Sequence, residues 1–144
     1  GRDAHTHGLK VGYYHFFRPG VSGADQFANY EKAVSGLPMD MIPVLDIEVE
    51  PKAGGQKQFE QDIQVFIRLC RKRFGVSPIL YCIPRFERQY LQAFAKYRKW
   101  YCGRIDDKAD MKRCLLWQIA IKNVPGIYGK VDWDYAPKVK KLLK

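Results

Sequence analysis

The nine residues MIPVLDIEV, at positions 41–49, constrain the fold and the function of this chain more than any other stretch. The run is apolar and rich in β-branched residues, which favours a buried strand. Toward its end it carries two acids, Asp46 and Glu48, separated by Ile47. Because successive side chains of a strand point to opposite faces, we expect the two acids on one face, roughly 6.6 Å apart along the backbone, and Ile47 in the packing.

Two carboxylates on one face of an apolar strand repel each other, so the pKa of one of them is expected to rise. A carboxyl group with a raised pKa is suited to general acid catalysis near neutral pH. The alternative is a strand end at which two acids simply meet solvent or an arginine. The tripeptide alone leaves both interpretations open.

Strands and helices alternate along the rest of the chain. Apolar runs predict further strands over 10–17, 78–83, 99–105 and 114–121. Helical spacing of apolar residues predicts helices over 24–36, 57–74 and 87–97, with Gly75 as the cap of the second. A polar stretch with Asp106, Asp107 and Asp110 joins the last two strands, residues 123–133 are rich in loop formers, and 135–144 is expected to form a basic amphipathic helix.

This alternation predicts an α/β fold with parallel strands joined by right-handed crossovers. No glycine-rich phosphate loop follows a strand, which disfavours a nucleotide-binding sheet. The alternative is a β/α barrel, whose site lies at the carboxyl ends of its strands. Candidate site residues occur toward the strand ends: Tyr14, His15, Asp46, Glu48, Tyr81, Trp117 and Gln118.

The chain has 144 residues, 47% of them hydrophobic, which suits a single domain over 1–144 with a core of its own. Its longest apolar runs are too short for a membrane span. The net charge of +10 favours an anionic partner, such as nucleic acid, an anionic membrane or an acidic wall polymer. No nucleic-acid-binding signature accompanies the basic residues, so nucleic acid is not the expected partner.

The four cysteines, Cys70, Cys82, Cys102 and Cys114, contain no C-x-x-C pair, which argues against a zinc ribbon or a thioredoxin-like motif. Buried free thiols are expected, with one disulfide left open for an exported protein. His5 and His7 have the spacing of a metal pair, yet no third ligand accompanies them in register. We therefore expect neither a metal nor a cofactor.

Five segments, in this order and at this spacing, resemble glycoside hydrolase family 25, the Chalaropsis-type lysozymes or N-acetylmuramidases. They are GLKVGYYHFF, PVLDIE, PILYCIPRF, LLWQIA and PGIYGKVDWDYA. The most specific pieces are Gly12-x-Tyr14-His15-Phe16, Asp46-x-Glu48, Trp117-Gln118 and Gly126-x-x-Gly129-x-Val131-Asp132.

The resemblance implies an irregular TIM-like β/α barrel that cleaves the β-1,4 bond between N-acetylmuramic acid and N-acetylglucosamine in peptidoglycan, outside the cytoplasm. Glu48 matches the proton donor, Asp46 the acid beside it, and Asp132 an acid of the same groove. Tyr14, Tyr81 and Trp117 match groove aromatics, and His15 and Gln118 accompany them as expected substrate-binding residues. His15 could instead be a histidine that orients a carboxylate.

The chain departs from the family pattern at its start. Family members begin with a strand that carries an aspartate, and residues 1–9 resemble the end of the helix after the second strand. The resemblance thus covers the barrel after its first two strands, and Asp3 does not match the family's first aspartate. The expected explanation is a fragment of a longer polypeptide. The alternatives are a missing part supplied by another chain and an inactive remnant that binds glycan or another polyanion.

Overall fold

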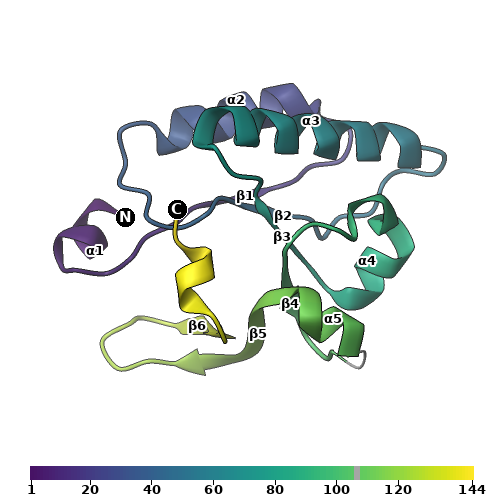
Figure 1. The fold of residues 1–144 in the computed structure, drawn as a ribbon. Helices are drawn as coiled ribbons and strands as arrows, with labels where there is room; N and C mark the ends of the chain where they lie inside the picture. Colours follow the sequence, from purple (N-terminus) through teal and green to yellow (C-terminus); the bar gives the residue numbers. More distant parts are fainter. Residues whose placement is uncertain (106–107) are drawn as a thin grey trace.

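The computed structural model describes residues 1–105 and 108–144 and contains one six-stranded sheet flanked by helices (Figure 1). The strands are β1 (Tyr14–Phe16), β2 (Val44–Asp46), β3 (Ile79–Cys82), β4 (Lys99–Cys102), β5 (Cys114–Asn123) and β6 (Lys130–Tyr135). The helices are α1 (Arg2–Thr6), α2 (Gly23–Val34), α3 (Gln56–Phe74), α4 (Pro84–Tyr90) and α5 (Lys108–Arg113), with short 3₁₀ turns η1 (Gln92–Phe94) and η2 (Val139–Leu142).

The strands follow one another across the sheet in the order β1-β2-β3-β4-β5-β6. The first five are parallel, and β6 returns antiparallel to β5 as a hairpin. The sheet is curled into half of a barrel, with α2 and α3 side by side along its outer face (Figure 1). The predicted α/β class and the partial barrel are therefore confirmed.

Successive side chains along the strands point to opposite faces of the sheet, and a hydrophobic core forms on each face. The outer core packs Leu45, Ile47 and Leu80 against α2 and α3, with Phe66 of α3 fully buried at its centre. The smaller inner core lies inside the curl and includes Val44, Ile79, Leu116 and Leu142. Both faces of β2 and β3 are thus buried near their amino ends, which explains why these strands read as almost continuous apolar runs.

The amino end of α2 is pinned to α3 at close range. Gly23 leaves no room for a side chain, because a Cβ there would lie 2.0 Å from the Asp62 carbonyl oxygen. Its backbone N–H donates to Asp62 Oδ1 at 3.0 Å, and Ser22 caps the helix by accepting from the Asp25 N–H. Gln26 then holds the loop after β1, since its Oε1 accepts from the Arg18 N–H at 2.8 Å. These contacts fix the carboxyl end of β1.

The expectations for the carboxyl-terminal part are only partly met. The stretch 123–133 contains the expected loop, over 124–129, but strand β6, which begins at Lys130, was not expected. The tail 135–144 is not an amphipathic helix: Tyr135 ends β6 and only the short turn η2 follows. The tail buries Leu142 in the inner core and hydrogen-bonds back, with the Ile42 N–H donating to the Leu142 carbonyl at 2.8 Å. Tertiary pairing here outweighs the helical pattern of the sequence.

Other element boundaries differ less. The helix expected over 87–97 begins at Pro84, ends at Tyr90, and is followed by η1. The strand expected over 41–49 is regular only from Val44 to Asp46. Part of the polar stretch after β4 forms α5, whereas Asp106 and Asp107 lie outside the described residues.

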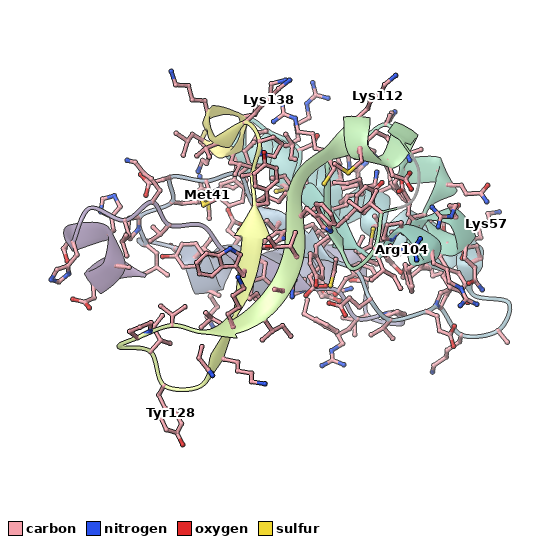
Figure 2. All side chains as sticks on the ribbon, turned by 90° about the horizontal axis from the view of Figure 1, so that it is seen from below. Met41, Lys57, Arg104, Lys112, Tyr128 and Lys138 are labelled. Carbon is pink, nitrogen blue, oxygen red and sulfur yellow. The ribbon has the colours of Figure 1, made fainter. Side chains whose placement is uncertain are left out.

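In the described part of the chain, no helix combines the length and the apolar character needed to cross a membrane. The four cysteines are free thiols, Cys70 and Cys82 being buried. The hairpin of β5 and β6 extends from the body of the molecule, with Tyr128 projecting near its tip (Figure 2).

Candidate functional site

A pocket of about 140 Å³ lies on the inner face of the sheet, toward the carboxyl ends of the parallel strands. It is lined by Tyr14, Val44, Asp46, Glu48, Tyr81, Trp100, Gln118 and Asp132. Each of the strands β1 to β6 contributes a side chain, and Glu48 lies two residues after the end of β2. The pocket therefore brings together six of the eight predicted site residues.

Asp46 is the last residue of β2 and is 9% exposed, whereas Glu48, two residues on, is exposed. Among the described residues, Asp46 Oδ1 has no hydrogen-bond partner. Burial, and secondarily the charge and the contact of Glu48, raise the pKa of Asp46 to about 7. The expected pair of same-face acids is therefore present, and the pKa of Asp46 is raised.

Hydrogen-bonded aromatic side chains form one wall of the pocket. The Tyr81 hydroxyl donates to Gln118 Oε1 at 2.8 Å, and burial raises the pKa of Tyr81, so the phenol remains neutral. The Trp100 ring lies edge-on to Tyr81, with 5.3 Å between centroids and 83° between planes. Tyr14 lies at the opposite edge of the sheet and is 65% exposed.

Strand β6 brings two further acids to the inner face. Asp132 lines the pocket, and Asp134 lies behind the lining, where its Oδ1 accepts from Trp100 Nε1 at 2.7 Å. Burial raises the pKa of Asp134, and the Asp132 charge adds to this. Sequence reasoning missed both Trp100 and Asp134. The alternation in KVDWDY, with acids two residues apart, was the available signal.

The structure does not bring His15 and Trp117 into this pocket. His15 points to the outer face, where it stacks on Phe66 at 5.3 Å and hydrogen-bonds to Gln26 at 3.1 Å. Burial lowers its pKa. Trp117 does not line the pocket, and its Nε1 donates to the Gly103 carbonyl at 2.7 Å. Each is adjacent to a true pocket residue, Tyr14 or Gln118, and strand alternation turns it to the other side.

The arrangement is suited to acid–base chemistry on a polar ligand. One buried carboxyl group with a pKa of about 7 lies beside an exposed carboxyl group, and a third acid lines the same pocket. Aromatic faces next to these acids suit the stacking of sugar rings. No group of three histidine, cysteine, aspartate or glutamate side chains suited to a metal ion occurs in the described ranges.

Comparisons with known proteins find relatives of this chain. Two curated relatives from Escherichia coli, both named uncharacterized protein YegX, are 28% identical (strain O6:H1) and 27% identical (strain K12) over 131 residues. The match covers 88% of this chain and 48% of each relative, so the chain spans about half the length of the curated relatives it matches.

Solved structures show the same fold. The Clostridium perfringens spore cortex lytic enzyme SleM superposes with a TM-score of 0.81 at 20% identity, over 98% of this chain and 54% of its own. A family 25 glycosyl hydrolase from Bacillus anthracis gives a TM-score of 0.81 at 20% identity, over 99% and 72%. A muramidase from Acremonium alcalophilum gives 0.70 at 21% identity, over 96% and 74%.

The family model of glycosyl hydrolases family 25 matches residues 1–124, which include Asp46, Glu48, Tyr81 and Gln118 but end before Asp132. This match covers most of the chain and includes the acid pair at the centre of the pocket. The chain therefore belongs to glycosyl hydrolases family 25.

Proposed function

We propose that this chain carries the catalytic centre of a peptidoglycan hydrolase that cleaves the β-1,4 bond between N-acetylmuramic acid and N-acetylglucosamine. The observation that carries the proposal is the pair of Asp46 and Glu48. One acid is buried with a pKa of about 7, the other is exposed, and both face a polar and aromatic pocket in a family 25 chain. The substrate lies in the cell wall, outside the cytoplasm.

The roles of the acids follow from where each can reach. Glu48 is exposed in the pocket and protonates the departing glycosidic oxygen. Asp46 lies deeper and, once ionised, stabilises the positive charge that develops on the sugar, or orients the substrate's N-acetyl group as an internal nucleophile. Asp132 faces them from β6 and assists in holding the substrate. The two carboxyl groups of the pair share one proton, which begins on Asp46 and serves the reaction through Glu48.

A second candidate is a glycan-binding domain that does not cleave. It is favoured by the net charge of +10 and by the 65% exposure of Tyr14, which leaves the pocket open on the β1 side. Stem peptides and other wall polymers supply the negative charge that such a surface attracts.

Product analysis separates the two candidates. Purified peptidoglycan is incubated with the chain, the soluble fragments are reduced with borohydride, and their masses are measured. The expected result is release of fragments whose reduced end is N-acetylmuramic acid. Fragments with N-acetylglucosamine at the reduced end would contradict the proposed bond, and a folded chain that binds the polymer without releasing fragments would support the binding domain.

The pH dependence of activity is expected to follow the shared proton. The raised pKa of Asp46, about 7, means that the pair keeps a proton below neutrality and loses it above. Because the reaction consumes that proton at the leaving oxygen, kcat/KM is expected to fall about tenfold per pH unit above about 7. Initial rates on soluble glycan strands between pH 4 and 9, at constant ionic strength, measure this. Activity that rises between pH 6 and 8 would contradict the shared-proton mechanism.

A further inference from the structure

The Trp100 indole is fixed on two sides, by a residue of the neighbouring strand β3 and by a residue of β6, which is not adjacent to β4. Its edge meets Tyr81 of β3, and its Nε1 donates to Asp134 of β6 at 2.7 Å. Strand β5 lies between β4 and β6. The hydrogen bond thus passes over β5 and connects the antiparallel hairpin to the parallel part of the sheet.

The register of the sheet makes this reach possible. Gln118 of β5 is paired with Cys102 on one side and with Asp134 on the other, so Asp134 is on the inner face, level with the carboxyl end of β4. An irregularity between Gln118 and Ala120 interrupts the ladder just beyond this pair. Such irregularities bend a strand and redirect its side chains. The hairpin therefore turns its two acids inward, one to the pocket and one to Trp100.

We propose that Asp134 is a positioning residue, which fixes the Trp100 indole as a wall against which a bound sugar ring packs. The inference rests on the proposed function in that the ligand is a peptidoglycan glycan strand. Trp100 lines the pocket beside Asp46 and Tyr81, whereas Asp134 does not line it, so Asp134 is expected to act on a ligand only through the indole.

A fixed indole favours binding because its orientation is settled before the sugar arrives. An indole has a single hydrogen-bond donor, and Asp134 accepts it. Without that acceptor the ring can rotate or move toward solvent, and binding must then restrict it again. Ordering a side chain on binding costs affinity, so the expected effect falls on KM and on ligand affinity rather than on the chemical step.

The test compares Asp134→Ala with Asp134→Asn. Asparagine keeps the Oδ1 acceptor and loses the charge, whereas alanine removes the acceptor. For Asp134→Ala we expect KM on soluble glycan strands to rise about tenfold, with kcat within about threefold of the wild type. Asp134→Asn is expected to restore KM to within about threefold of the wild type, because the hydrogen bond remains. Urea unfolding of each variant establishes that it is folded.

A binding measurement keeps this inference separate from the proposed function. Binding of a tetrasaccharide of alternating N-acetylglucosamine and N-acetylmuramic acid is followed by tryptophan fluorescence, with Trp133→Phe as the matched control. Trp133 precedes Asp134 but lies under Lys122, 4.8 Å from its ring centroid, and does not line the pocket. If the wild type binds the tetrasaccharide without cleaving polymer, the proposed function fails while the affinities of the Asp134 variants still decide the inference.

The decisive arm is a double-mutant cycle with Trp100→Leu. If Asp134 acts through the indole, Asp134→Ala is expected to lower tetrasaccharide affinity about tenfold in the wild type and to have no further effect once Trp100 is leucine. The inference is overturned if Asp134→Ala leaves affinity unchanged, if its effect persists in the Trp100→Leu background, or if Asp134→Asn lowers affinity as strongly as Asp134→Ala. Absence of tetrasaccharide binding by the folded wild type also overturns it.

Discussion

Replacing Glu48 by glutamine is expected to reduce the rate of peptidoglycan cleavage by about a thousandfold while leaving the fold intact. Glutamine has nearly the same size but cannot donate a proton to the leaving oxygen, and loss of a general acid typically costs two to four orders of magnitude, here about 4 kcal/mol of barrier. Glu48 is exposed, so its replacement disturbs no core packing. Release of reduced muropeptides, quantified by mass spectrometry, measures the effect.

Glu50→Gln is the matched control for this variant. Glu50 lies two residues further on, is also exposed, and does not line the pocket; its Oε2 accepts from the Tyr90 hydroxyl at 2.8 Å. We expect Glu50→Gln to cleave within about threefold of the wild type, as is usual for a surface substitution. Full lytic activity in Glu48→Gln, or equal losses in the two variants, would contradict the assignment of Glu48 as proton donor.

Replacing Asp46 has a different expected signature. Asparagine at this position keeps the shape of the side chain, removes the negative charge beside Glu48, and abolishes the shared proton. A residual activity whose fall with pH begins below about 7 would support the assignment of the raised pKa to Asp46. The comparison thus distinguishes a carboxyl group that donates the proton from one that stores it.

The acid pair could be found from the sequence because its pattern is local. Asp46 and Glu48 stand two residues apart in one strand, and a strand fixes the relative direction of its own alternate side chains whatever its neighbours do. The alternation of strands and helices was equally local, and it predicted the parallel sheet that the structure confirms. The approximate positions of Tyr81 and Gln118 followed once their strands were recognised.

His15 and Trp117 show what the sequence could not settle. Tyr14-His15 and Trp117-Gln118 are neighbouring pairs at strand ends, and only one member of each pair can face inward. Shifting the register of a strand by one residue moves each of its side chains to the opposite face of the sheet. The choice depends on partners far along the chain: His15 is held on the outer face by Gln26 and by Phe66 of α3. Nothing in either dipeptide encodes those contacts.

The Trp100–Asp134 contact was missed for a related reason. Its two residues are 34 positions apart and come together only because β6 turns back along β5. Residues 123–133 are rich in loop formers and 135–144 have helical spacing, so the sequence predicts no strand that would bring Asp134 to Trp100. Helical spacing in a short basic tail is weak evidence when an unpaired strand edge is available nearby.

Replacing Glu87 by alanine is expected to give the largest loss of stability among single polar substitutions, about 3 to 5 kcal/mol. The replacement leaves the buried Lys99 cation without its counter-ion. Lys99 is fully buried and Glu87 is 3% exposed, and Lys99 Nζ lies 3.1 Å from Glu87 Oε1. The Tyr101 hydroxyl also donates to Glu87, from the same strand as Lys99. A lysine at the start of a strand would ordinarily be expected at the surface, so the sequence does not predict the buried pair of Lys99 and Glu87.

The contacts of Glu87 with Lys99 and Tyr101 bear on function because they fix β4 from the outer face of the sheet. Lys99 and Tyr101 point outward to Glu87 of α4, so Trp100, between them, must point inward to the pocket. Lys99 also donates to the carbonyls of Phe94 and Tyr97, at 2.7 and 2.9 Å, and ties η1 and the following turn to the strand. Loss of Glu87 should therefore loosen the pocket wall as well as the outer layer, which near-ultraviolet circular dichroism of the tryptophans would detect.

Urea unfolding of Glu87→Ala and Glu31→Ala measures the stability effect against a matched control. Glu31 pairs with Arg73 at 2.6 Å, but both side chains are well exposed, and such pairs contribute only about 0 to 1 kcal/mol. In the double variant Glu87→Leu with Lys99→Met, neither charge is left unpaired, so part of the loss should be recovered despite the unsatisfied carbonyls. Equal urea midpoints for Glu87→Ala and Glu31→Ala would show that the buried pair does not hold α4 to β4. The same conclusion would follow if the double variant lost more stability than the separate losses of Glu87→Leu and Lys99→Met added together.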